Sequence, residues 1–297
     1  MKSADYPTLY SECDACAEGN QKKRFQLLKV EISLLIAIAV LGAIEWREFP
    51  NFGVFPPLSI AVSLSILFVF TVIMENKKFE KNWFAARAVA EMVKGESWLY
   101  MMKAEPYDQQ KGSEAKAKFK EFLKQIVESQ ALPWSELIHN HEVTQVTETM
   151  DEQRNAGFDE QKKFYISSRI NDQRSWYARK ARENRVKESR MTLLMWILLA
   201  LGVALAFVNI ILSDFPINAV GVATTASAAV LSWIGARSYG ELSQSYGVVA
   251  QQLSFVEDDA KEAETEDELR KIVIEAEETM SKEHRFWRIK RLSSFKL

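Results

Sequence analysis

Two cysteines and two histidines are the side chains whose spacing is typical of a metal site. Cys13 and Cys16 form a Cys-x-x-Cys pair, which is half of a tetrahedral zinc site, and His139 and His141 could supply the other half. Nothing in the sequence brings the two pairs together, and two cysteines are too few for a disulfide framework. We therefore expect reduced, solvated thiols in an unstructured N-terminus, surface histidines and no bound metal.

Other signatures of enzyme chemistry are missing from the sequence. It contains no glycine-rich phosphate-binding loop and no Gly-x-Ser-x-Gly nucleophile motif. The formal net charge of −2 gives no reason to expect nucleic-acid binding. The basic run 169–190 could bind anionic lipid headgroups or a nucleotide, but Asp172, Glu183 and Glu188 interrupt it, so an anchor that sets membrane topology is favoured. We predict a protein that is not an enzyme and has no cofactor.

Hydroxyl groups within apolar segments are the remaining polar side chains of interest. At 100° per residue, Thr224, Thr225 and Ser232 share one helical face with Gly221 and Ala228. Earlier in the chain, Ser59 and Ser63 are i, i+4 neighbours. The pore-lining candidates are Ser59, Ser63, Thr224, Thr225 and Ser232. These residues either line a water-filled path between assembled subunits or let helices pack closely, and packing is the commoner use. No charge lies mid-segment, which argues against a proton relay, a voltage sensor or an ion-coupled transporter.

The segments that carry these hydroxyl groups are long enough to cross a membrane. Residues 191–212 contain no charged side chain, and the apolar residues 218–234 follow after a short turn. At about 1.5 Å of rise per residue, such a helix matches a bilayer core about 30 Å thick. A similar hairpin is predicted over 30–44 and 55–74. The predicted fold class is therefore an all-α integral membrane protein with four transmembrane helices in two hairpins and long cytoplasmic helices.

Basic residues predict the orientation of the two hairpins. They lie before the first span, after the second, before the third and after the fourth, whereas Arg47 is the only base in the two connecting loops. Because lysine and arginine stay on the cytoplasmic side, both termini and the central segment are predicted to be cytoplasmic. The first apolar run is preceded by about 25 polar residues, which is unlike a signal peptide.

Breaks in the helical pattern divide the chain into four predicted parts. These are a cytoplasmic N-terminal segment (1–26), a first hairpin with a cytoplasmic helix (27–107), a helical connector (108–158) and a second hairpin with long flanking helices (159–297). The two halves share this plan and a Phe-Pro pair in each turn, Phe49-Pro50 and Phe215-Pro216, which indicates an old tandem duplication. One helix is predicted to run from about Asp159 through the third span, and Thr265 with Glu268 forms a capping box before the last helix.

Short sequence motifs lie beside the predicted hairpins: an acidic-Gln pair, Trp-Tyr, Lys-Ala and Asn before the third span, and Ser-x-Glu-His-x-x-Trp at the C-terminus. These motifs resemble those of the SLATT family, the SMODS- and SLOG-associating two-transmembrane effector domains of bacteria. The first half is similar to a sister version of the domain, although Ala86 stands where that version usually has Tyr. The matching positions are Trp83, Arg87, Glu91, Asp172, Gln173, Trp176, Tyr177, Lys180, Asn184, Glu283, His284 and Trp287.

The resemblance implies an effector of a nucleotide-dependent antiphage or conflict system. A partner enzyme or sensor protein would produce or detect a nucleotide signal, and the effector would perforate the bacterial inner membrane as a homo-oligomeric pore. Two other interpretations remain open: a non-conducting membrane scaffold that recruits a cytoplasmic partner through its helical stalk, and a constitutive small-ion channel. The motif residues could contact a ligand, or they could be packing anchors between helices.

Overall fold

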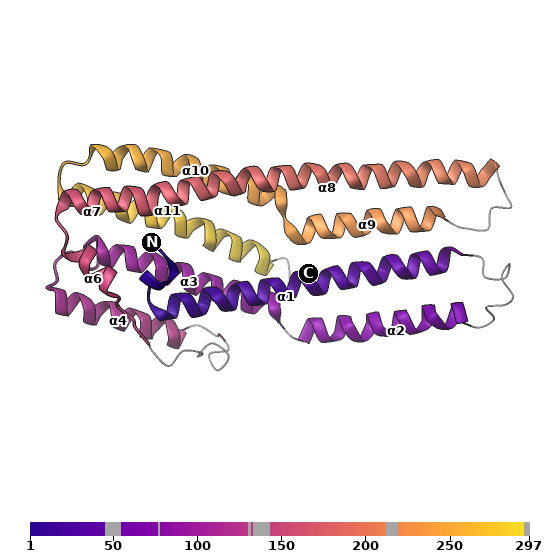
Figure 1. Cartoon of the computed structure of the whole chain (residues 1–297), viewed down its shortest axis with the longest axis horizontal. Coiled ribbons are helices and arrows are strands. Elements are labelled where there is room, and N and C mark those ends of the chain that lie inside the picture. Colours follow the sequence, from indigo (N-terminus) through magenta and orange to yellow (C-terminus); the bar gives the residue numbers. More distant parts are fainter. Residues whose placement is uncertain (45–54, 77, 130–131, 133–142, 212–218, 294–297) are drawn as a thin grey trace. The chain divides into compact units, whose positions relative to one another are not determined.

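The computed structural model describes residues 1–44, 55–76, 78–129, 132, 143–211 and 219–293, with backbone alone for 55–56, 74–76 and 282–293. The predicted all-α class is confirmed, since these residues form helices and no strand (Figure 1). The elements are η1 (Ser3–Asp5), α1 (Thr8–Ala43), α2 (Phe55–Asn76), α3 (Phe79–Met101), α4 (Gly112–Ser129), α6 (Glu148–Asn155), α7 (Phe158–Tyr165), η4 (Ile166–Asn171), α8 (Asp172–Ile211), α9 (Ala219–Arg237), α10 (Tyr239–Glu262) and α11 (Glu266–Ser293).

Two helix predictions are confirmed closely. Helical structure runs without a break from Phe158 to Ile211 through α7, η4 and α8, and η4 is a short π-helical segment in its course. At the start of α11, the Glu268 backbone N–H donates to Thr265 Oγ1 at 3.3 Å, and the Thr265 N–H donates to Glu268 Oε2 at 3.2 Å. This reciprocal pair is the capping box, which satisfies two of the N–H groups that a helix start leaves open.

The expectation of an unstructured N-terminus is wrong. Helix α1 begins at Thr8, and Leu9, Cys13 and Ala17 are buried on one of its faces because residues at this spacing align along a helix. Cys13 is therefore not solvated, and burial raises the pKa of its thiol to about 12. Its possible zinc partners, His139 and His141, lie outside the described residues. Among the described residues, no group of histidine, cysteine or acidic side chains could hold a metal ion.

The chain divides into two compact units. The core unit comprises Met1–Gln21, Glu80–Ala181 and Gln244–Leu297, and the hairpin unit comprises Lys22–Phe79 and Arg182–Ser243. In both units, segments far apart in the sequence are brought together.

The core unit is built around α3, which has buried residues on more than one of its faces. Val89, Val93 and Trp98 are fully buried, and the Trp98 indole N–H donates to the Tyr6 hydroxyl at 3.0 Å. Helices α4, α10 and α11 each bury a stripe of residues spaced by three or four, as expected for amphipathic helices that share one core. The α11 stripe consists of Leu269, Val273, Ala276 and Met280.

Three helical stretches are long and apolar enough to cross a membrane: Thr8–Ala43, Phe158–Ile211 and Ala219–Glu262. Four spans were predicted, but the fourth candidate, Pro57–Ile73 in α2, is a shorter apolar helix. Its seventeen residues rise about 25 Å, slightly less than a bilayer core about 30 Å thick. The structure thus gives three clear candidates and one short one.

In the hairpin unit, α8 and α9 pack closely. A Cβ atom added at Gly202 of α8 would lie 3.6 Å from both Ala223 Cβ and Thr224 Cγ2 of α9. The Ser227 hydroxyl of α9 donates to the Met195 carbonyl oxygen of α8 at 3.3 Å. Small residues therefore let the two backbones approach, as is usual between helices in membranes.

Helix α9 also contacts helix α1, near the C-terminal end of α9. The Phe25 and Trp233 rings have centroids 6.0 Å apart, and the Arg237 guanidinium carbon lies 3.7 Å from the Phe25 centroid. Aromatic rings and basic residues at one level are typical of a membrane–water interface.

Candidate functional site

Exposed side chains of two different kinds cover the helices of the hairpin unit. On α8 and α2 they are large and apolar, as at Ile211 and Phe68, which are 78% and 71% exposed. On α9 the exposed side at 221–235 is formed instead by small residues. These are Gly221, Thr224, Ala228, Ser232 and Gly235, with Leu231 as the one large apolar side chain among them.

The pore-lining candidates do not all have the same environment. Thr224 and Ser232 are exposed, whereas Thr225 is half-buried. The Thr224 hydroxyl donates to the Val220 carbonyl oxygen of its own helix at 3.0 Å, and its methyl carbon lies toward Gly202 of α8. Ser59 and Ser63 are half-buried on α2. Close packing of α9 against α8 therefore uses Ala223, Ser227 and the methyl group of Thr224.

The motif residues of the first half lie in the core unit and link helices. The Arg87 guanidinium donates to Asp14 of α1 at 2.7 Å and pairs with Glu91, one turn along α3, at 2.5 Å. Trp83 stacks on Phe84 with ring centroids 4.5 Å apart. Of these contacts, the bond from Arg87 to Asp14 holds α3 against α1.

The aromatic motif residues of the second half form a cluster between α8 and α10. The ring centroids of Trp176 and Tyr177 lie 5.0 Å apart. The Tyr246 centroid lies 5.4 Å from that of Trp176 and 5.5 Å from that of Tyr177. Tyr177 is almost fully buried. Such aromatic contacts are packing anchors, so for these residues the structure favours the packing interpretation.

The other motif positions are more varied. Asp172 accepts a hydrogen bond from its neighbour Gln173 at 2.9 Å near the surface, Lys180 is half-buried and Asn184 is buried. The side chains of Glu283, His284 and Trp287 lie outside the described residues.

Both halves of the chain match known effector domains. Residues 7–162 match the SMODS and SLOG-associating 2TM effector domain 3, and residues 165–287 match the SMODS and SLOG-associating 2TM effector domain 1. The first match alone covers more than half of the chain. The chain belongs to the SLATT family. No curated protein and no solved structure matches it.

Two SLATT domains of different kinds thus stand in tandem, which confirms the resemblance of each half to its own version of the domain. SLATT domains are effector domains associated with conflict and antiphage systems. Their two-transmembrane character and the three long apolar helices identify this chain as a membrane protein.

A buried ion pair in the core unit links two helices of the second SLATT domain, η4 and α11, and the sequence did not single it out. Arg169 in η4 donates through Nε to Glu277 Oε1 at 2.8 Å and through Nη2 to Glu277 Oε2 at 2.5 Å, and the Tyr165 hydroxyl donates to Oε1 at 3.2 Å. Burial alone would lower the pKa of Arg169, but Glu277 raises it above its ordinary value. The arginine therefore stays charged although it is only 2% exposed.

Helical phase is the signal that could have found Glu277. It lies four residues after Val273 and three before Met280, on the buried face of α11, whereas Glu275 and Glu278 are exposed. Because a buried carboxylate needs a partner, this position predicts a cation opposite it. The π-helical η4 contains that cation, and π segments often occur at functional sites.

Proposed function

We propose that this SLATT protein is a non-enzymatic effector that assembles from several copies into a pore and permeabilises the bacterial inner membrane. A nucleotide-signalling enzyme or sensor of a conflict system would provide the trigger. Two hairpins per chain are too few to enclose a wide conduit, whereas several copies can do so. Four spans and cytoplasmic termini are part of this proposal, supported by the placement of basic residues outside the connecting loops.

The exposed side of α9 is the observation that carries the proposal. Lipid tails pack favourably against large apolar side chains, which α8 presents at Trp196, Ile197 and Phe207. The small and hydroxylated side of α9 offers lipid little contact, but it suits either another helix or water. An assembly in which α9 faces neighbouring copies and a central path accounts for this difference between the spans.

Leakage from lipid vesicles provides the test. The full-length protein, reconstituted into vesicles loaded with a fluorescent dye and supplied with the partner that provides the trigger, should release the dye. The double variant Thr224→Leu/Ser232→Leu should reduce release at least about tenfold, because two branched side chains narrow and dry the path. Its insertion into the vesicles should be unchanged, since both positions are exposed in the single chain.

A matched double variant controls for the chemical change. Ser65 and Thr71 of α2 are also exposed, and their hydroxyls donate to Ala61 and Leu67 of the same helix at 2.9 Å each. Ser65→Leu/Thr71→Leu therefore removes the same two residue types away from α9 and should leave dye release unchanged. Equal release from both double variants would overturn the assignment of α9. Vesicles that stay tight with every protein, although it is inserted and oligomeric, would support the scaffold instead.

A further inference from the structure

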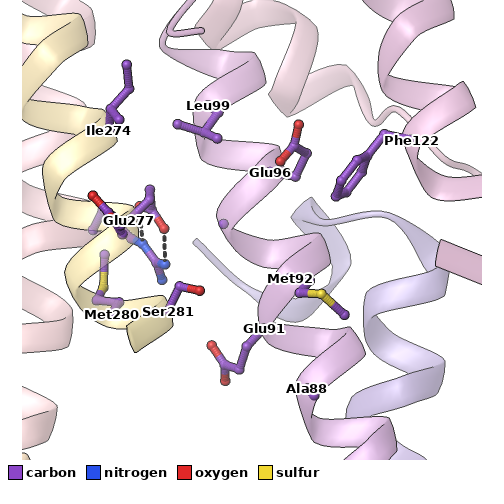
Figure 2. Close-up of a pocket in the computed structure, with 13 residues that line it drawn as sticks. Ala88, Glu91, Met92, Glu96, Leu99, Phe122, Ile274, Glu277, Met280 and Ser281 are labelled. Carbon is purple, nitrogen blue, oxygen red and sulfur yellow. Dashed lines mark hydrogen bonds and ion pairs between the residues drawn. The ribbon is translucent and has the colours of Figure 1, made fainter. Parts of the chain in front are cut away.

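A cavity of about 350 Å³ lies inside the core unit, and the pore proposal makes no use of it. Figure 2 shows α3 on one side of it and α11 on the other, with Phe122 of α4 nearby. Small residues on α3 make the room: Ala88 lines the cavity, and a Cβ added at Gly95 would lie only 3.3 Å from Glu277 Oε2. Its volume is at the lower end of that of pockets for small organic molecules.

One hydrogen-bond donor at this cavity lacks a partner. Arg169 lines the cavity, and its Nε and Nη2 atoms are used by Glu277, as the dashed lines of Figure 2 mark. Its Nη1 atom is buried and has no hydrogen-bond partner within the described structure. A buried donor without an acceptor costs about 1–3 kcal/mol, so such atoms are rare unless something else binds them. The missing group is an acceptor atom in the cavity.

The other lining residues define what kind of molecule can bring that acceptor. Apolar walls are supplied by Met92, Leu99 and Phe122, which suit a flat or branched hydrocarbon body. Carboxylates of Glu91 and Glu96 also line the cavity, and the Tyr107 hydroxyl already donates to Glu96 at 2.7 Å. Arg169 is neutralised by Glu277, and Glu91 is already paired with Arg87, so the described lining offers no spare cation, which disfavours phosphates and carboxylates.

We propose that this cavity binds a small uncharged organic molecule with an amide-like group on an apolar body. Its carbonyl oxygen accepts the hydrogen bond of Arg169 Nη1, and its N–H groups donate to the carboxylates of the lining. The apolar body rests against Met92, Leu99 and Phe122. This proposal does not depend on pore formation, because it concerns binding within the core unit alone.

Three probes of nearly equal shape separate the possible head groups. Benzamide offers both a carbonyl acceptor and N–H donors, benzoate offers acceptors with a negative charge, and benzamidine offers donors with a positive charge and no acceptor. Binding of each probe to the full-length protein in lipid nanodiscs can be followed by saturation-transfer NMR and titration. Benzamide should bind at least about tenfold more tightly than benzoate, and more tightly than benzamidine.

Cavity-filling variants test whether benzamide binds in this cavity. Ala88→Leu should weaken benzamide binding at least about tenfold, whereas Ala117→Leu, the same change at an exposed position of α4, should leave it unchanged. If Ala88→Leu fails to fold, Met92→Trp fills the cavity from the same helix. Equal affinity for the three probes, no binding of any of them, or benzamide binding that survives a folded cavity-filling variant would each overturn the proposal.

Discussion

Buried charged residues organise the core unit at the scale of single side chains. Arg169 and Glu277 pair with two hydrogen bonds, and the guanidinium of Arg154 donates to the Tyr100 and Tyr107 carbonyl oxygens at 2.6 Å and 2.9 Å. Arg169 thereby ties η4 to α11, and Arg154 ties α6 to the end of α3. Such groups stabilise one arrangement of helices, because removing a partner leaves an uncompensated buried charge.

Glu277→Gln tests this at the ion pair. The amide keeps the shape of the side chain but leaves the Arg169 charge uncompensated, so the free energy of unfolding should fall by about 3 kcal/mol or more. Thermal and denaturant unfolding in detergent measure it. Glu275→Gln makes the same change at an exposed position two residues earlier and should alter stability by less than about 0.5 kcal/mol. Similar effects of the two substitutions would contradict a structural role for the pair.

Glu96 gives a prediction about pH. Burial raises the pKa of this carboxyl above its ordinary value of 4.5, and the hydrogen bond from Tyr107 only partly opposes the shift. The folded state therefore holds the proton more tightly than the unfolded state, and wild-type stability falls as pH rises from 4.5 through the raised pKa. Glu96→Gln removes this loss while keeping an oxygen for Tyr107. The melting temperature of the variant minus that of the wild type should thus increase with pH over this window; a constant difference would refute the prediction.

At this scale the sequence predicts residue types better than partners. Motif matching found Arg87, Trp176 and Tyr177, but it did not find Glu277, because several glutamates adjoin it and only the phase of α11 separates the buried one from its neighbours. Cys13 was placed in solvent because polar residues around it hide the apolar stripe of α1. Both differences arise from tertiary packing, which local spacing does not reveal.

At the scale of elements, the interface of α8 and α9 depends on residues without bulky side chains. Gly202 faces Ala223 and Thr224, whereas Gly221, on the exposed side of α9, has no neighbouring atom within 4 Å of an added Cβ. Gly202 therefore lies at the contact between α8 and α9, whereas Gly221 lies on the side of α9 that faces away from this contact.

Substituting each glycine by leucine separates the two contacts. Gly202→Leu should destabilise the hairpin by about 1–3 kcal/mol, because the added carbons force the helices apart. Gly221→Leu should leave the stability of the single chain unchanged but weaken self-association. Unfolding in detergent and crosslinking in vesicles measure the two effects. A loss of stability from Gly221→Leu, with self-association intact, would contradict the separate roles.

Element boundaries show how far sequence reasoning reaches. Long helices and the Thr265–Glu268 cap were predicted, because periodicity and capping are local signals. The break between α9 and α10 was not predicted. It occurs at Ser238, whose backbone takes a positive φ of 49°, and serine is not a usual helix breaker.

At the scale of the whole molecule, two SLATT domains give one chain two hairpins and one core unit assembled from both. The core unit takes α3 and α4 from the first domain and α10 and α11 from the second. The sequence indicated the duplication through its shared plan, but not this shared core, since contacts between distant segments leave no mark on local composition.

The membrane potential of bacteria that express the protein tests the central proposal most directly. A potential-sensitive dye should report rapid depolarisation once the effector is induced and triggered, and cells with Thr224→Leu/Ser232→Leu at equal membrane abundance should keep their potential. A potential that stays intact with the triggered wild-type protein present in the membrane would contradict a pore-forming effector.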